Sequence, residues 1–281
     1  MRIITVKIKE SFIYHLINEE KAHATINKYL HDVDEFQVWL GEQDLNKAVV
    51  LAYKLYLCEH YAPASVNAAL SSLNSFFNFA EWYDLKVKNL KIQKQIFASA
   101  DKELTKAEYD SLLQAAKRKK KERLYLLMQT ICSTGIRVSE VCHITVEAIR
   151  CGVAEINCKG KHRRVFLPKQ LCQILKQYIK GQKIKSGAVF ITKNGRPLDR
   201  SNIWSEMKKL CREAAVSEKK VFPHNLRHLF ARTYYSVQKD IARLADILGH
   251  SNVNTTRIYT METGEIHRKQ IQKLGLLRLT T

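Results

Sequence analysis

The sequence predicts a mainly α-helical protein with a small antiparallel β-sheet, divided into a helical first domain and an α+β second domain. Three observations lead to this prediction. A length of 281 residues corresponds to about two domains of ordinary size. Apolar residues recur at three- and four-residue intervals through most of the chain, and only "GVAEINC" and "RRVFLP" have the character of strands. An apolar fraction of 46% is enough for each domain to bury a core.

The first domain is predicted to span residues 1–98 and to contain about four helices. The segment "ATINKYLHDVDEFQVWL" places Ile26 and Val33 on one amphipathic face. Apolar residues have the same periodicity in "NKAVVLAYKLYLCEHY" and "SVNAALSSLNSFFNFAEWY", and Pro63 marks the beginning of the latter helix. Residues 1–9 alternate charged and apolar side chains, which favours a short extended segment at an edge of this domain.

The second domain is predicted to span residues 99–281, after a linker near residues 95–104 where the helical periodicity lapses. Thr105 and Glu108 form the T-x-x-E pattern of a capping box at the start of the next helix. The two strand-like segments, joined by the turn "KGKH", predict a β-hairpin. Helical periodicity returns in three later segments, at 169–181, at 201–214 and from 224 onward.

The basic residues are distributed unevenly. Residues 1–97 hold 11 lysines and arginines and 11 aspartates and glutamates, whereas the rest of the chain holds 36 basic and 16 acidic residues. The whole net charge of +20 therefore comes from the second domain, which favours a polyanionic partner, most often nucleic acid, with anionic lipid as a less favoured alternative. The run "AAKRKKKER" is by default a solvated helix end, and alternatively a surface for phosphate contacts.

Several classes of protein are disfavoured. The seven cysteines are odd in number and no two have CxxC spacing, so we interpret them as reduced packing residues rather than a disulfide framework or a zinc site. No apolar run is long enough for a membrane span, and the N-terminus lacks the features of a signal peptide. We expect a cytoplasmic protein associated with the nucleoid.

The segment "CSTGIRVSEV" contains a candidate anion site. Gly135 is predicted to end one helix, and Arg137 lies where the next begins. An arginine beside a helix N-terminus is well suited to bind an anion. Glu140, three residues later on the same face, could hold the guanidinium in place. A surface ion pair is the alternative interpretation of this stretch alone.

Cations and imidazoles recur in two further segments. Lys159 lies on the predicted turn of "NCKGKHRRVF", where a lysine is ordinarily solvated but beside a phosphate would be a proton donor. In "FPHNLRHLFA", His224 and Arg227 share one face of a helix. His224 and His228 have the spacing of two zinc ligands, but no second pair of cysteines or histidines has ligand spacing, so we disfavour zinc.

The last candidate segment is "LGHSNVNTTRIYT". Gly249 is predicted to end a helix, His250 follows it directly, and Tyr259 lies nine residues later on a short helix. Taken alone, such a tyrosine is most simply a half-buried core residue.

The ordered set of arginine, lysine, His-x-x-Arg, histidine and tyrosine resembles the tyrosine recombinases, the family of phage integrases, Xer recombinases and Cre. The resemblance lies in "TGIRVSEV", "KGKHRR", "HNLRH" and "LGHSNVNTTRIYT", and it extends over nearly the whole chain. It implies that residues 1–98 are a SAM-like core-binding domain for DNA, with "TINKYLHDVDEFQVWL" similar to its usual pattern. Residues 99–281 would be the catalytic domain. Larger phage integrases have a further N-terminal DNA-binding domain, and we expect simple target sites for this chain.

The resemblance implies a role for each residue that binds the scissile phosphate. Arg137 and Arg227 would bind its non-bridging oxygens, His250 would donate a hydrogen bond to it, and Glu140 would support Arg137. Two fixed guanidinium groups stabilise the charge that develops in the transition state, and the loss of one such donor typically costs about 10²–10³-fold in rate.

The resemblance also implies the roles of the groups that move protons and bonds. Tyr259 would attack the phosphorus and form a 3′-phosphotyrosyl bond, and His224 would move the proton of the tyrosine. Lys159 would protonate the departing 5′ oxygen. Because the turn after Lys159 is one residue shorter than the usual pattern, Lys161 is an alternative donor. The covalent bond conserves the energy of the phosphodiester, so we expect neither ATP nor a metal cofactor.

The resemblance leaves the biological role open. We favour integration or excision of a mobile element over Xer-like resolution of chromosome or plasmid dimers. The apolar tail "EIHRKQIQKLGLLRLTT" would be a liability if exposed. The resemblance implies that it docks on a neighbouring protomer, so we expect a homo-tetramer on DNA, with a directionality factor as a further candidate partner. A type IB topoisomerase and a non-catalytic DNA-binding regulator are the competing functions. A metal-dependent transposase is disfavoured because the sequence lacks the clustered carboxylates it needs.

Overall fold

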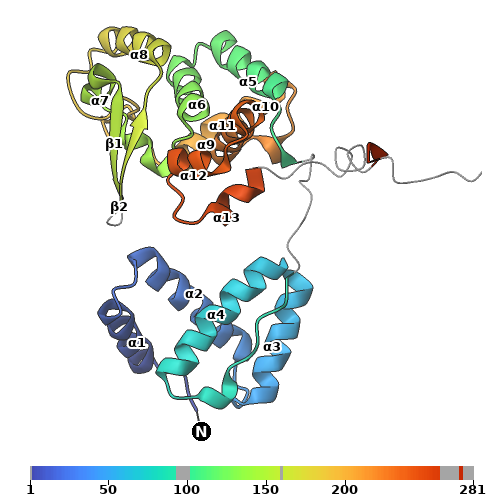
Figure 1. The fold of residues 1–281 in the computed structure, drawn as a ribbon. Coiled ribbons are helices and arrows are strands. Elements are labelled where there is room, and N and C mark those ends of the chain that lie inside the picture. Colours follow the sequence, from blue (N-terminus) through green and yellow to red (C-terminus); the bar gives the residue numbers. More distant parts are fainter. Residues whose placement is uncertain (1, 93–101, 159–160, 260–271, 275–281) are drawn as a thin grey trace, which may run out of the picture. The chain divides into compact units, whose positions relative to one another are not determined.

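A computed structural model describes residues 2–92, 102–158, 161–259 and 272–274. The chain divides into two compact units, Met1–Lys94 and Gln95–Thr281 (Figure 1). The boundary expected between residues 98 and 99 lies outside the described residues. Most described residues are helical and one two-stranded antiparallel sheet is present, which confirms the predicted fold class. No described helix is both long and apolar enough to cross a membrane.

The first unit consists of four α-helices and a short 3-10 helix. They are α1 (Val6–Asn18), α2 (His23–Leu40), α3 (Lys47–His60), α4 (Pro63–Phe79) and η1 (Tyr83–Leu85). The amphipathic faces predicted from the periodicity meet in one core, where Phe12 packs edge-on against Phe76 with ring centroids 5.3 Å apart. Four helices were expected here, and four are found.

The extended segment expected at residues 1–9 was wrong. Thr5 caps the N-terminus of α1 by accepting a hydrogen bond from the backbone N–H of Ile8, so the chain is already helical from Val6. Ile4 is buried, and its carbonyl accepts a hydrogen bond from Gln37 of α2. The alternation of charged and apolar residues therefore does not mark a strand. It covers the buried residue Ile4 and the first turn of α1.

The second unit is built around two helices, α6 (Glu122–Thr134) and α11 (Pro223–Gln238), which pack along each other. The hairpin lies beside α7 and α8 at one side of this pair, and α5 and α10 lie at the other (Figure 1). The remaining elements, in chain order, are α5 (Lys106–Arg118), η3 (Val138–His143), α7 (Val146–Cys151), β1 (Val153–Cys158), β2 (Lys161–Phe166), α8 (Lys169–Gly181), α9 (Arg200–Lys208), α10 (Cys211–Ala214), η4 (Glu218–Lys220), α12 (Ile241–Leu248), α13 (Val253–Thr256) and η5 (Arg257–Tyr259).

Two local predictions for this unit can be compared with the structure. The capping box is confirmed, because Thr105 and Glu108 exchange hydrogen bonds of 3.2 and 2.8 Å at the start of α5. The helical segment predicted at 201–214 is confirmed, although it is not one continuous helix. It is divided into α9, which packs against α6 and α11, and α10, which packs against α5. These two directions of packing require a break in the helix.

The predicted β-hairpin is confirmed, but its turn is tighter than expected. The strands pair from Val153 opposite Phe166 to Cys158 opposite Lys161, so Lys161 already belongs to β2. Only residues 159 and 160 remain for the turn, and both lie outside the described residues. One face of the hairpin packs on the core and carries Ala154, Ile156 and Val165.

Candidate active site

Arg227 lies at the centre of the candidate site, fixed to the ends of two helices. Its side chain extends from the first turns of α11 and the residue is only 1% exposed. The guanidinium donates hydrogen bonds to the carbonyl of Gly135, 2.6 Å away, and to that of Leu248, 2.8 Å away. These carbonyls belong to the C-terminal ends of α6 and α12, where the partial negative charge of a helix favours a cation. Gly135 and Gly249 end these helices with left-handed backbone conformations, as the sequence predicted.

Arg137 lies beside Arg227 and is held mainly by Glu140. Its guanidinium donates to Glu140 Oε1 at 2.9 Å and to the carbonyl of Gly249 at 3.2 Å. The backbone N–H of Arg137 also donates to the Glu140 carboxylate. The helix that begins here is 3-10 rather than α, but the three-residue spacing brings the two side chains together. The side chain of Arg137 is 36% exposed, so part of this cation faces solvent.

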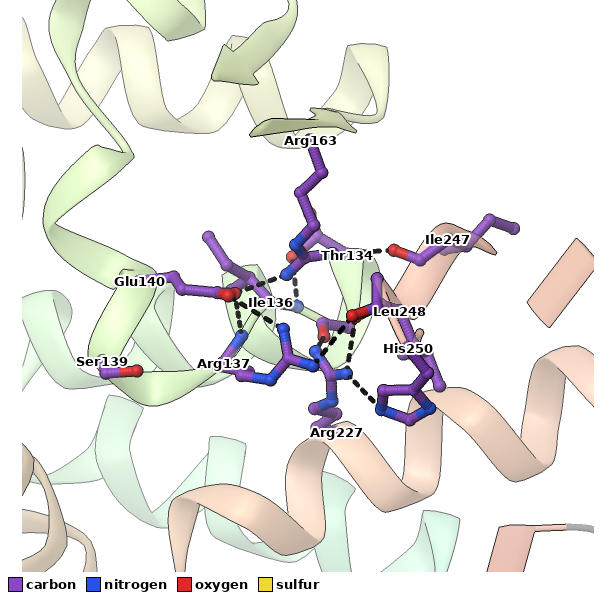
Figure 2. Close-up of polar contacts among 12 residues, drawn as sticks. Thr134, Ile136, Arg137, Ser139, Glu140, Arg163, Arg227, Ile247, Leu248 and His250 are labelled. Atoms are coloured by element: carbon purple, nitrogen blue, oxygen red, sulfur yellow. Dashed lines mark hydrogen bonds and ion pairs between the residues drawn. The ribbon is translucent and has the colours of Figure 1, made fainter. Parts of the chain in front are cut away.

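Glu140 contacts a second arginine, Arg163 of β2, which the sequence analysis did not single out (Figure 2). Arg163 forms an ion pair with the Glu140 carboxylate and donates to the carbonyl of Ile247 at 2.8 Å. Burial tends to raise the pKa of Glu140, but the backbone N–H of Arg137 and the guanidinium groups of Arg163 and Arg137 outweigh it and lower the pKa. The carboxylate therefore remains ionised between two cations. Arg163 could have been identified from the strand pattern, because it lies two residues before the apolar Val165 and therefore shares the inward face of the strand.

His250 completes this group of residues as a neutral imidazole. Its Nε2 lies 2.9 Å from the Arg227 guanidinium, and its Nδ1 lies 2.9 Å from the hydroxyl of Thr256. A guanidinium only donates hydrogen bonds, so Nε2 must accept and Nδ1 must carry the proton. Burial, Arg227 and Arg137 lower the pKa of His250 to about 4. Arg227 therefore fixes the tautomer, and the fully buried hydroxyl of Thr256 accepts the Nδ1 proton, a role that the sequence did not reveal.

Tyr259 is buried against two histidine rings. It ends η5 and is 4% exposed, and it shares an apolar cluster with Leu248. The ring of His228 meets it edge-on with centroids 4.7 Å apart, and the ring of His250 lies parallel to it at 6.0 Å. Burial and Arg137 lower the pKa of Arg227 to about 10, whereas the hydroxyl of Tyr259 acts in the opposite direction. Tyr259 is therefore both a core residue and a neighbour of the buried arginine.

His224 lies in the same group of aromatic rings as Tyr259. In the described structure its ring contact is with His228, at 4.5 Å between centroids, and His228 in turn contacts Tyr259. Burial, together with Arg227, Arg200 and Arg137, lowers the pKa of His224. Burial and His224 lower the pKa of His228 to about 3. His228, considered in the sequence only as a zinc ligand, is thus a neutral ring between the proposed base and the tyrosine.

A pocket of about 730 Å³ opens beside these residues. Its cationic lining consists of Arg137, Arg200 and Lys208, and the ring of His224 and the half-exposed ring of Trp204 form part of its wall. An open, cationic pocket next to two fixed arginines is suited to a phosphodiester with its flanking nucleotides. Lys159 lies outside the described residues.

The neutral histidines predict a loss of stability in acid. Unfolded histidines have a pKa of about 6.5, whereas burial holds those of His228 and His250 at about 3 and 4. At a pH below about 6.5 and above these folded-state values, the unfolded chain binds protons that the folded chain does not. The free energy of unfolding therefore falls as the pH drops below about 6.5. Above that pH the two groups contribute no pH dependence.

Urea unfolding of the wild type and of His228→Gln at pH 7.5, 6.0 and 5.0 would check this expectation. The wild type should lose stability relative to His228→Gln as the pH falls. The exposed His31→Gln is the control and should follow the wild type. An unchanged difference between wild type and His228→Gln at all three pH values would contradict the prediction.

Comparison with known proteins places both units in one family. Residues 102–265 match the phage integrase family, and residues 10–83 match the phage integrase N-terminal SAM-like domain. The tyrosine recombinase XerA of Thermococcus kodakarensis is 31% identical over 280 residues, which cover 96% of this chain and 96% of that protein. The tyrosine recombinase XerC of Roseiflexus sp. is 28% identical, with 89% of this chain and 88% of that protein covered.

Solved structures show the same fold. A λ integrase dimer bound to a COC′ core site has a TM-score of 0.75 and 18% identity, covering 93% of this chain and 97% of that chain. The Tn1549 transposon integrase in complex with transposon right end DNA has a TM-score of 0.69 and 17% identity, covering 95% and 99%. With the match of 102–265 and the XerA relative, these findings confirm the resemblance stated from the sequence. The chain belongs to the phage integrase family, and it is a site-specific tyrosine recombinase, an enzyme that cleaves and rejoins DNA strands.

Proposed function

We propose that this recombinase integrates or excises a mobile element by way of a 3′-phosphotyrosyl intermediate, with Tyr259 as the nucleophile. The observation that carries the assignment of the nucleophile is the place of Tyr259. Its ring lies parallel to that of His250, whose Nε2 is 2.9 Å from the buried Arg227, and Arg227 and Arg137 are the proposed phosphate-binding groups. A phenol beside two fixed guanidinium groups is placed to attack a phosphorus whose oxygens they bind.

The reaction is a transesterification, in which one phosphorus–oxygen bond forms as another breaks. The Tyr259 oxygen forms a bond to phosphorus as the bond to the 5′ oxygen breaks, and the phosphate charge is held by Arg137 and Arg227. The phenolic proton passes to His224, which contacts the same histidine ring, that of His228, as Tyr259 does. Lys159, with Lys161 as the alternative, gives a proton to the departing 5′ oxygen. Attack by a 5′ hydroxyl on the phosphotyrosine reverses these steps and rejoins the strand.

We also propose that the second unit grips double-stranded DNA through its excess of positive charge, and that the active form is a homo-tetramer joined by the C-terminal tail. The tail, residues 265–281, falls outside the described residues except for 272–274. A λ integrase tetramer bound to a Holliday junction has a similar fold, which supports such an assembly. A directionality factor and a location on the nucleoid in the cytoplasm complete the proposal.

Xer-like dimer resolution is the second candidate for the biological role. The relatives include XerA and XerC proteins, which favour it, whereas the structural similarity to a transposon integrase favours mobility. Both roles use the same chemistry, so the active site does not distinguish them. The DNA on which the enzyme acts does.

Covalent capture in the native host tests the proposal. Cells expressing the tagged wild type are lysed in denaturant, and the DNA that remains attached to the protein is sequenced. We expect attached DNA whose sequence lies at the ends of a mobile element or at its insertion site. A chromosomal or plasmid site that occurs once per replicon, with no element beside it, would favour dimer resolution. Absence of attached DNA would contradict the covalent mechanism.

A further inference from the structure

We propose that Arg163 is a positioning residue, which fixes Arg137 through Glu140 and thereby sets the rate of DNA cleavage. The inference rests on the proposed catalytic function of Arg137. Arg163 lies on β2, opposite Ile156 in the hairpin, and its side chain is 14% exposed. It points away from the hairpin toward Glu140 and the end of α12 (Figure 2).

Three arginines bind three successive carbonyls at the C-terminal end of α12. Arg163 donates to Ile247, Arg227 to Leu248 and Arg137 to Gly249. This is the turn that carries His250, so all three arginines position the same short segment. Arg227 and Arg137 belong to the proposed phosphate-binding set, whereas Arg163 is bound on its other side by the Glu140 carboxylate.

These contacts form a closed ring. Glu140 binds Arg137, Arg137 binds Gly249, the backbone leads back to Ile247, Ile247 binds Arg163, and Arg163 returns to Glu140. Without Arg163, the buried carboxylate of Glu140 would keep Arg137 as its one charged partner among the described residues, and the turn of α12 would lose one of its three arginine contacts. The position of the Arg137 guanidinium would then be less strictly determined.

The backbone at Gly249 shows how closely Arg163 approaches this turn. Gly249 has a positive φ of 65°, and a Cβ added there would collide with the Cδ of Arg163. The methylene stem of Arg163 therefore packs directly against the residue that precedes His250. A lysine has a similar stem but only one nitrogen, so it could not reach the Glu140 carboxylate and the Ile247 carbonyl in the planar geometry of a guanidinium.

The same strand offers a matched control. Arg164 follows Arg163 directly, but its side chain is 72% exposed and lies 3.4 Å from an equally exposed Glu155. Such a surface ion pair contributes little. Arg163→Lys and Arg164→Lys therefore make the same chemical change on the two faces of one strand.

The experiment measures single-turnover cleavage of a nicked duplex that carries the DNA site recovered by covalent capture, with protein at saturating concentration. We expect Arg163→Lys to cleave about 10–100-fold more slowly, which is the usual range when a residue that orients a functional side chain is replaced. Its Kd for the same DNA should stay within about twofold of the wild type, because the Arg163 guanidinium is bound within the protein by Glu140 and Ile247. Arg164→Lys should cleave at the wild-type rate. An undiminished rate for Arg163→Lys would overturn the inference.

A double-mutant comparison separates positioning from a general loss of structure. If Arg163 acts through Arg137, then Arg163→Lys should cause little further loss in a protein that already carries Arg137→Lys, because the two changes affect one interaction. If Arg163→Lys merely destabilises the unit, its loss would multiply with that of Arg137→Lys, and the inference would be wrong. A wild type that fails to cleave at all would instead reject the proposed function.

A substrate with sulfur in place of the 5′ bridging oxygen tests the route of the effect. A thiolate leaves without protonation far more readily than an alkoxide, because thiols have a pKa of about 8.5. This substrate should restore cleavage to a Lys159→Ala protein if Lys159 is the proton donor. It should not restore cleavage to Arg163→Lys. Restoration in Arg163→Lys would show that Arg163 instead assists protonation of the leaving group by Lys159 on the same hairpin. That result would overturn the proposed effect through Glu140.

Discussion

Replacement of Tyr259 by phenylalanine is expected to abolish covalent attachment of DNA while leaving DNA binding intact. The change removes one oxygen and keeps the ring that packs against His228 and His250. The fold of the second unit should therefore be unchanged. Loss of a nucleophile that forms a covalent intermediate typically costs about 10⁴-fold or more in rate, so no protein–DNA adduct should be detected on the time scale of the wild-type reaction.

The measurement is denaturing electrophoresis of protein incubated with labelled DNA that carries the captured site, beside a binding assay on the same DNA. Tyr234→Phe and Tyr235→Phe are the matched controls, because both tyrosines pack against the cluster that contains Tyr259. Both controls should still form the adduct. An adduct with Tyr259→Phe would mean that another residue is the nucleophile.

Substitution of Arg227 by lysine is expected to slow cleavage by about 10²–10³-fold. The guanidinium of Arg227 contacts the carbonyls of Gly135 and Leu248 and the ring of His250 at the same time. A single ammonium group cannot occupy these three directions and also bind a phosphate oxygen. The substitution should also lower the stability of the second unit, since two buried carbonyls lose a charged donor.

The rate is measured at saturating protein and well below the melting temperature of the variant, so that loss of folded protein does not contribute. Arg243→Lys is the control, because Arg243 lies on α12 near the site but its side chain is 70% exposed. Its rate should equal that of the wild type. If folded Arg227→Lys cleaves within about threefold of the wild type, Arg227 does not bind the scissile phosphate in the transition state.

Local sequence patterns predicted the helices of both units and the hairpin because these patterns follow from short-range geometry. Apolar spacing specified the faces of α2 and α4, and Thr105 with Glu108 specified the start of α5. The extended segment expected at residues 1–9 was wrong, because the chain is helical from Val6. The helical segment predicted at 201–214 is divided into α9 and α10, which pack against different helices, and the periodicity did not specify this division.

The family and the order of its motifs could be read from the sequence, since each motif is a short run of residues around one functional group. The same runs contain Arg137 with Glu140, and the glycines that end α6 and α12. These contacts span three residues or one helix end, and their geometry follows from the chain itself.

Only the tertiary structure reveals the contacts that join these runs. Arg137 meets Gly249 across 112 residues, and Arg227 meets Gly135 across 92. Arg163 and Thr256 have no distinctive motif, and they acquire their roles because the hairpin and α13 pack beside the end of α12. The residue types at the site were thus determined by the sequence, whereas their mutual positions were decided by packing, because no local spacing specifies a hydrogen bond between segments a hundred residues apart.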